Sequence, residues 1–374
     1  MDINTYLKEL EYLVNTDSGS EYPDGLNTIA AFFSSRFRDM GWIVKEYDLA
    51  PKSGTCLVCA NREAEHYDVM LMGHMDTVFP KGTCAQRPFR IEGNKAYGPG
   101  VCDMKQGCLM IYYLLKELPR EICDKLNILA VFNPDEEIGS VHSRPVYAPY
   151  AKKTDYAFLF EARDSKGFCC HQRKGSMAFE AVFTGVAGHC GFVFENGARS
   201  AISEMARWIV ALDGLQSREL DTSVNVGVVS GGIKVNVVPD HASMSVSIRF
   251  SRIEEVQRIE DTLQQLLKLA ETNGIQAELQ NRRGKMPLVP NEKACAYIDH
   301  ITQLATQKGM HLTFKARGGL SDANIITQYG PVCLDGLAPA GGAGHSPDEY
   351  MLLDTIEPSF QVANLLLEDL ANSK

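Results

Sequence analysis

Carboxylate and imidazole side chains recur in this chain directly after apolar runs and in glycine-rich turns. The residues concerned are His74, Asp76, Asp103, Asp135, Glu136, Glu137, Glu161 and His345. Zinc takes its oxygen and nitrogen ligands from carboxylates and neutral imidazoles. Buried parallel strands read as continuous apolar runs, and ligands gather at their carboxyl ends. We therefore expect one metal site that is assembled from distant parts of the chain.

Each of these clusters has an ordinary alternative when it is considered alone. A histidine and an aspartate two positions apart, such as His74 and Asp76, often occur by chance. Asp103 precedes a predicted helix, and aspartate is a common helix N-cap. The acids at 135–137 are also typical of a solvated turn, and His345 of an ordinary loop. The recurrence of such groups at the ends of successive predicted strands favours the metal site.

Charge counting supports two divalent ions. Asp103, Glu137 and Glu161 supply three negative charges, the two histidines are neutral ligands, and one hydroxide completes the balance. Three acids in a row after a buried strand repel one another unless cations neutralise them. Distinct roles suit two of the three, because one carboxylate can ligate a metal while its neighbour serves as a general base toward an activated water.

The apolar periodicity predicts two domains around these clusters. Helices are expected at 3–16, 27–40 and 104–118, and strands at 42–48, 55–60, 67–73, 126–132 and 156–160. Alternation of this kind is typical of an α/β domain with buried strands. After Gly175 a different order follows, with strands at 177–184, 223–230, 241–250 and 275–282 and helices at 198–212 and 253–272. The β-α-β-β-α-β order predicts a ferredoxin-like α+β domain.

The α/β pattern resumes after Pro287 and Pro290. Further elements are expected at 293–308 (helix), 311–315 (strand), 321–328 (helix), 331–334 (strand) and from Thr355 (helix). The predicted boundaries are therefore residues 1–174 and 286–374 for a catalytic domain, with residues 175–285 inserted as a second domain. A length of 374 residues accommodates both.

The bulk composition excludes several classes of protein. A formal net charge of -10 argues against binding to nucleic acid or to an anionic membrane surface, and no apolar run has the length of a membrane span. The first residues open an amphipathic helical pattern without the features of a signal peptide, so a cytoplasmic protein is expected. The eleven cysteines are expected to be reduced, and Cys56 and Cys59 lack the second pair that a zinc ribbon needs.

Taken in order, the segments HMDTV, GPGVCDMKQG, DEEIGS, FEA and GAGH resemble those of the M20 metallopeptidases, and within them the glutamate carboxypeptidase (carboxypeptidase G2) group. The resemblance covers nearly the whole chain. It implies a zinc-exopeptidase-like catalytic domain with a mixed, mainly parallel sheet, an inserted lid and dimerisation domain, and two Zn²⁺ per subunit, with Co²⁺ or Mn²⁺ as alternatives. One departure is Gln106, which replaces the first glycine of the family's D-M-K-G-G.

The resemblance also implies residue roles at the metal site. By these roles His74, Glu137, Glu161 and His345 would complete the shells of the two metals, and Asp103 would bridge them. Glu136 would be the general base and Asp76 would orient His74. The peptide that follows the bridging aspartate is often cis in relatives.

Further roles are implied for the inserted domain and for a glycine-rich loop. His189 resembles the lid histidine that reaches a substrate oxyanion, often in the neighbouring subunit's site, and Asn236 lies in the segment that contacts substrate. Arg249 would hold a substrate carboxylate, a task that suits the guanidinium fork. Gly318 and Gly319 would line the pocket of the leaving residue. The ordinary alternatives are a surface turn for His189 and an exposed strand position for Arg249.

Together these features predict a dizinc hydrolase that cleaves an amide bond beside a free carboxylate in a small peptide or an N-acyl amino acid. The second candidate is an N-acyl amino acid deacylase, aminoacylase or deacetylase, and the third is a tripeptide aminopeptidase. A non-catalytic peptide-binding protein is the last candidate. A homodimer formed through the inserted domain is expected from the resemblance.

Overall fold

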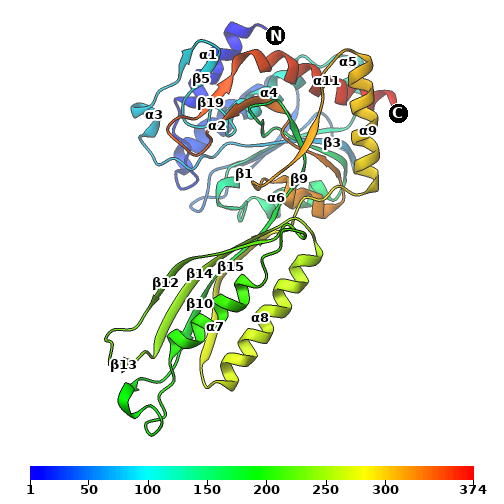
Figure 1. Ribbon diagram of the computed structural model, residues 1–374. Coiled ribbons are helices and arrows are strands. Elements are labelled where there is room, and N and C mark those ends of the chain that lie inside the picture. The colour runs from blue at the N-terminus through cyan, green and yellow to red at the C-terminus, as the bar shows by residue number, and fades with distance from the viewer. The chain divides into compact units, whose positions relative to one another are not determined.

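The computed structural model describes residues 1–374, which divide into two compact units. Unit 1 consists of Met1–Gln172, Pro290–Arg317 and Ser321–Lys374, and unit 2 of Arg173–Val289 and Gly318–Leu320. Both chain termini belong to unit 1 (Figure 1). Compared with the predicted boundaries of 175 and 285, unit 2 begins two residues earlier and ends four residues later. It also includes the short glycine-rich segment at 318–320.

Unit 1 is built on a six-stranded mixed sheet. The strand order is β1 (Ile43–Tyr47), β2 (Cys56–Ala60), β6 (Ile128–Asn133), β3 (Tyr67–His74), β7 (Thr154–Leu159) and β17 (Val332–Leu334). The pairs β6–β3, β3–β7 and β7–β17 are parallel, whereas β1–β2 and β2–β6 are antiparallel. Every residue of β2, β3 and β6 is buried, as the continuous apolar runs predict. The predicted mixed, mainly parallel sheet is confirmed.

Helices pack around this sheet. They are α1 (Ile3–Val14), α2 (Pro23–Asp39), α4 (Lys105–Lys116), α5 (Arg120–Lys125), α6 (Arg144–Ala151), α9 (Glu292–Gln307), α10 (Ala323–Ile326) and α11 (Ile356–Asn372). The apolar core of unit 1 includes residues of α1, α2, α4, α9 and α11. In α4 all residues from Lys105 to Leu115 are buried, so this helix is enclosed on every side. Helix α2 begins at Pro23, four residues before the predicted start, because proline suits the first turn of a helix.

Several short elements of unit 1 were not predicted. Three-residue strands such as β4 (Arg90–Glu92), β5 (Lys95–Tyr97) and β19 (Tyr350–Leu352) join β18 (Ala338–Gly342) and β8 (Ala162–Arg163) in a five-stranded sheet. A second small sheet pairs β16 (Phe314–Arg317) with β9 (Cys169–Arg173), so the strand expected at 311–315 begins three residues later. Helix α3 (Thr83–Gln86) is a single turn. Such lengths carry too few periods of hydrophobicity to be recognised from sequence.

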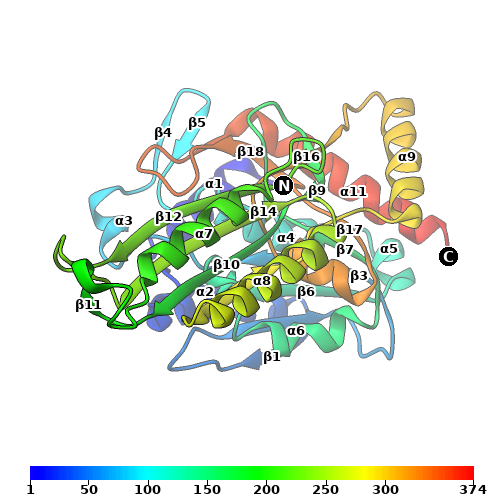
Figure 2. The same cartoon turned by 60° about the horizontal axis from the view of Figure 1, so that its bottom comes forward.

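Unit 2 has the predicted β-α-β-β-α-β order. Its elements are β10 (Gly175–Thr184), α7 (Ala201–Asp213), β12 (Ser223–Gly231), β14 (His241–Phe250), α8 (Glu254–Thr272) and β15 (Gln276–Lys285). The antiparallel sheet has the order β12-β14-β10-β15, and both helices lie on one of its faces (Figures 1 and 2). A further two-stranded sheet pairs β11 (Gly188–His189) with β13 (Val237–Val238). The core of unit 2 is separate from that of unit 1.

Alternation along β14 divides its side chains between the two faces of this sheet. Ala242, Met244, Val246, Ile248 and Phe250 are buried in the core of unit 2. The intervening residues, which include Arg249, therefore point to the opposite face.

All eleven cysteines are free, and Cys56 and Cys59 are buried residues of β2. No helix combines the length and the apolar character that a membrane crossing requires.

Candidate metal centre

Asp103 lies between two histidines that come from opposite ends of the sequence. Its Oδ1 is 3.0 Å from Nε2 of His74, and its Oδ2 is 3.2 Å from Nε2 of His345. His74 is the last residue of β3, whereas His345 lies in the connection between β18 and β19. The carboxylate thus presents one oxygen to each imidazole, which is the arrangement expected of a group that bridges two cations.

A second acid accompanies each histidine. Glu161 Oε1 lies 3.6 Å from His74 Nε2, and Glu137 Oε2 lies 3.1 Å from His345 Nε2. One atom each of His74, Asp103 and Glu137 lie within 4.8 Å of one another, close enough to hold one metal ion. The structure therefore brings together all five residues that were predicted as metal ligands.

Asp76 fixes the neighbouring acidic turn. Its Oδ1 accepts the backbone N–H of Glu136 and its Oδ2 accepts that of Glu137, each over 3.0 Å. The hydroxyl of Ser20 also donates to Oδ2, over 2.7 Å. Nδ1 of His74 is 3.0 Å from the carbonyl of Asp76 and 3.3 Å from its Oδ1. A fully buried Asp76 therefore orients both the first histidine and the 3₁₀ turn that begins at Glu136.

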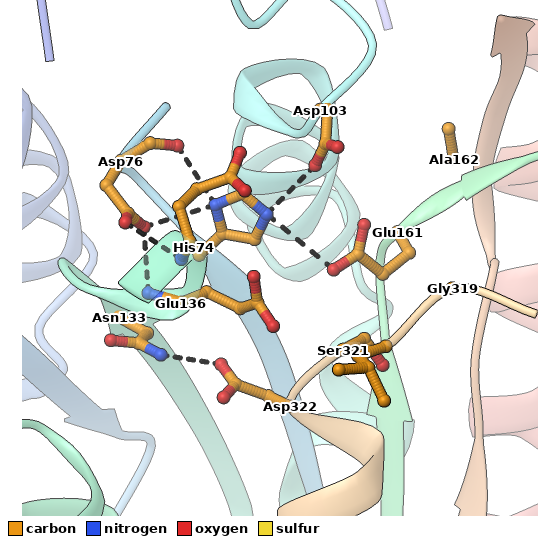
Figure 3. Close-up of polar contacts among 12 residues, drawn as sticks. His74, Asp76, Asp103, Asn133, Glu136, Glu161, Ala162, Gly319, Ser321 and Asp322 are labelled. Carbon is orange, nitrogen blue, oxygen red and sulfur yellow. Dashed lines mark hydrogen bonds and ion pairs between the residues drawn. The ribbon is translucent and has the colours of Figure 1, made fainter. Parts of the chain in front are cut away.

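The predicted general base lies in the same region. Glu136 is buried, and Figure 3 shows its carboxylate and that of Glu161 pointing toward the centre of the cluster. Behind the turn, Asn133 donates to Asp322 over 2.6 Å, and Ser140 also donates to Asp322. This buried contact fixes the end of β6 from which the acidic turn departs.

The electrostatics of the cluster are those of acids that require positive charge. Hydrogen bonds to Asp103 and Glu137 raise the pKa of His345 to about 10. Burial raises the pKa of Glu137 to about 7. Burial opposes ionisation of Asp103, but hydrogen bonds with His345 and His74 hold its pKa below the ordinary range. Protons on the imidazoles thus compensate the carboxylates, and a divalent cation would take over that task when it displaces those protons.

One buried atom fits a cation directly. Oε1 of Glu137 is buried and has no hydrogen-bond partner, although the other oxygen of this carboxylate faces His345. A buried carboxylate oxygen without a partner is unfavourable unless a cation or donor satisfies it. Two imidazoles and three carboxylates form a donor set that suits zinc. The residues at this site therefore fit one or more divalent ions.

The loop that carries Asp103 depends on residues that sequence reasoning did not identify. The carboxylate of Glu349 accepts three backbone N–H groups of this loop, and burial raises its pKa to about 6. Lys105 is buried, donates to the carbonyl of Thr16 over 2.7 Å, and has a pKa that burial lowers to about 8. The peptide between Asp103 and Met104 is cis, as expected from the resemblance. The only sequence feature that could have drawn attention to Glu349 is its position shortly after the glycine-rich segment at 341–344.

The two glycine positions of the D-M-K-G-G motif differ in what they require. A Cβ at Gly107 would lie 2.0 Å from the carbonyl oxygen of Phe160, so only glycine fits between α4 and the end of β7. Gln106, at the other position, is accommodated because its side chain extends to β18 and donates to the carbonyl of Pro339 over 3.2 Å.

The other predicted site residues belong to unit 2. His189 and Asn236 are exposed neighbours at the two-stranded sheet, where the N–H of Cys190 donates to the Asn236 carbonyl over 3.1 Å. Arg249 is half-buried near the far end of β14. The Gly319 carbonyl accepts from Arg173 Nη1 over 3.1 Å, and space around Gly318 is open. The roles predicted for these residues stay predictions.

Comparison with known proteins supports the fold and the family that the sequence motifs resemble. Carboxypeptidase G2 of Pseudomonas sp. (strain RS-16) is 28% identical over 98% of this chain and 90% of its own length. Succinyl-diaminopimelate desuccinylase of Stenotrophomonas maltophilia (strain K279a) is 25% identical over 77% of this chain and 80% of its own. The crystal structure of aminopeptidase PepT from Bacillus cereus ATCC 10987 superposes with a TM-score of 0.78 at 19% identity, with 99% of both chains covered.

The family match covers most of the candidate site. Residues 70–369 match the family described as Peptidase family M20/M25/M40, a segment that contains every predicted metal ligand. This chain therefore belongs to peptidase family M20/M25/M40 and is a metallopeptidase or amidohydrolase of that family.

Proposed function

We propose that the protein is a co-catalytic dizinc hydrolase that cleaves an amide bond next to a free carboxylate. The observation that carries the proposal is the position of Asp103, whose two oxygens face His74 and His345 over 3.0 and 3.2 Å. Each histidine has its own acid, Glu161 or Glu137. One ion would be held by His74, Asp103 and Glu161, and the other by His345, Asp103 and Glu137.

The chain's own residues would then direct the proton transfers. When bound, the two ions supply Lewis acidity toward the scissile carbonyl and toward the attacking water. Glu136 would take the proton of that water and pass it to the leaving amine. Asp76 holds the backbone of Glu136 in place, so this base has little freedom to leave the reacting atoms. His189 would stabilise the oxyanion, as the family resemblance implies.

Two names among the relatives support the choice of substrate class. The match to carboxypeptidase G2 over nearly the full chain favours a carboxypeptidase of the glutamate carboxypeptidase type. The match to a succinyl-diaminopimelate desuccinylase favours the second candidate, an N-acyl amino acid deacylase. Both classes would use Arg249 to hold the free carboxylate of the substrate.

A homodimer is part of the proposal. His189 and Asn236 lie beyond the end of the sheet where β14 begins at His241, with β13 at that end in Figure 1. Arg249 is eight residues further along β14, roughly 27 Å at about 3.4 Å per residue. One small substrate cannot touch Arg249 and His189 of the same chain over that distance. A second copy would therefore supply His189.

The free cysteines favour a reducing compartment such as the cytoplasm.

Hydrolysis of a matched peptide panel by zinc-loaded protein tests the substrate class. The panel contains dipeptides with both ends free, with the amine acylated, and with the carboxylate amidated. We expect activity to survive acylation and to be lost on amidation. The reverse pattern would assign the protein to the aminopeptidases. No hydrolysis of any peptide, together with no bound metal at neutral pH, would favour a non-catalytic peptide-binding protein.

A further inference from the structure

The carboxylate of Glu349 lies inside the loop that presents Asp103. Its Oε2 accepts the backbone N–H of Gly100 over 2.9 Å. Its Oε1 accepts those of Cys102 and Asp103 over 2.8 and 2.9 Å. The residue is 2% exposed, so these three bonds are protected from water. Hydrogen bonds to an ionised acceptor are stronger than those between neutral groups.

The loop needs such an acceptor because of its backbone path. Gly98 and Gly100 both have positive φ angles, of 143° and 75°, which turn successive N–H groups toward one point. None of the three N–H groups takes part in a regular helix or strand. Buried N–H groups without partners would destabilise the loop, and a carboxylate with two oxygens satisfies all three.

Glu349 is also tied to the other histidine. It follows His345 by four residues and precedes β19, which pairs with both β18 and β5. The loops pack closely, because a Cβ at Gly341 would lie 2.5 Å from Cys102 Sγ. A Cβ at Gly344 would lie 3.5 Å from Asp103 Oδ2. The chain segment from His345 to Glu349 thus connects the predicted ligand His345 to the loop that carries the predicted ligand Asp103.

We propose that Glu349 is a positioning residue that sets the separation of Asp103 and His345 and thereby the affinity of the site for its two ions. This inference rests on the proposed function, since it assumes that both residues bind metal. The Glu349 carboxylate accepts backbone N–H groups of the Asp103 loop, and it would act on the metal site through that backbone. Outer residues that orient metal ligands typically change metal affinity by roughly 10- to 100-fold when they are altered.

Titration of Co²⁺ into the metal-free full-length protein tests the proposal. Co²⁺ is the probe because its visible absorption reports the geometry of its ligands. In Glu349→Gln one acceptor oxygen becomes an N–H₂ donor that faces the loop's own N–H groups. We expect Co²⁺ affinity to fall at least ten-fold and the absorption band to change, at a temperature where circular dichroism shows the variant to be folded. Asp348→Asn is the matched control, because it removes an exposed charge from the same loop, and we expect wild-type affinity.

A second variant separates positioning from charge and serves if Glu349→Gln does not fold. Glu349→Asp keeps the charge but is one methylene too short to reach all three N–H groups, so Co²⁺ affinity should again fall. Wild-type affinity in Glu349→Asp would overturn the proposal in favour of a charge effect. Lower thermal stability of Glu349→Gln with Co²⁺ affinity within two-fold of wild type would also overturn it. If wild-type protein binds no Co²⁺, the proposed function itself fails, and the two failures are thus distinguishable.

Discussion

Oδ1 of Asp76 accepts the backbone N–H of Glu136 over 3.0 Å. The same carboxylate also accepts the N–H of Glu137, so one buried acid fixes the proposed base and a proposed ligand. In Asp76→Asn one of these acceptors becomes a donor, and the acidic turn should shift. We expect a loss of roughly 10- to 100-fold in metal affinity or kcat, measured by chelator competition and steady-state kinetics.

Ser20→Ala is the matched control for Asp76. It removes one hydrogen bond to Oδ2 and leaves both backbone contacts in place. Ser20→Ala should lower the free energy of unfolding by about 1 kcal/mol, with little change in kcat. Equal effects of the two substitutions on kcat would contradict the role assigned to Asp76.

Glu136 should be required for turnover and dispensable for metal. Glu136→Gln keeps the shape of the side chain but removes its ability to accept a proton. We expect kcat to fall by roughly 10²- to 10⁴-fold, while bound metal, measured by plasma emission spectroscopy, equals that of wild type. Glu357→Gln, at an exposed position of α11, should leave both quantities unchanged. Full turnover by a metal-loaded Glu136→Gln variant would exclude Glu136 as the base.

Metal stoichiometry should distinguish Asp103, the proposed bridging ligand, from His345, which is proposed to bind one ion only. Because Asp103 faces both histidines, Asp103→Ala should weaken the binding of both proposed ions. His345→Ala should weaken the binding of only the ion that Glu137 would also hold. Dialysed protein should then retain close to no metal in the first variant and about half the wild-type content in the second. His300→Ala, which removes an exposed histidine paired with Asp369, is the control. Identical loss in Asp103→Ala and His345→Ala would argue against two distinct sites.

Mixing two inactive variants tests whether His189 acts across subunits. His189→Ala keeps an intact metal centre, and Glu136→Gln keeps an intact His189. If His189 serves the neighbouring chain, a mixed dimer contains one complete site, and activity should reappear on mixing to roughly a quarter of wild type. Each variant mixed with itself is the control. Absence of any recovery, with subunit exchange verified by native mass spectrometry, would place His189 in its own subunit's site.

Gly107, in the first turn of α4, should tolerate alanine less well than Gly214, which follows α7. A Cβ at this position meets the carbonyl of Phe160 at 2.0 Å, and backbone cannot move aside as a side chain does. Gly107→Ala should therefore lower the free energy of unfolding by about 1–3 kcal/mol or more, measured in denaturant. Gly214→Ala is the control, since Gly214 has φ -63° and ψ -14°, which alanine adopts without strain. A stable Gly107→Ala variant would show that α4 can shift away from β7.

Long buried strands made much of unit 1 predictable. The runs that became β3 and β6 are continuous and apolar, and parallel strands deliver their carboxyl-terminal residues to one edge. The candidate ligands His74 and Glu137 were identifiable because they follow these runs. The β-α-β-β-α-β order of unit 2 was predictable for a similar reason, since the six strands and helices of that order are each at least nine residues long.

What could not be predicted depends on contacts between distant segments. Strands of three residues, such as β5 and β19, have no usable periodicity, and pairing with each other is what defines them. The role of Glu349 depends on N–H groups that lie almost 250 positions earlier in the chain. The difference between Gln106 and Gly107 is likewise visible only once Phe160 and Pro339 are in place.

The order of the proposed ligands along the chain has a consequence for biosynthesis. His345 and Glu349 follow the whole of unit 2 in the chain. A nascent chain can assemble β3, β6 and β7 with His74, Asp103 and Glu161 long before β18 and β19 leave the ribosome. His345 is therefore the last of the five proposed ligands to be synthesised, and a chain terminated before it would lack the histidine proposed for the second ion.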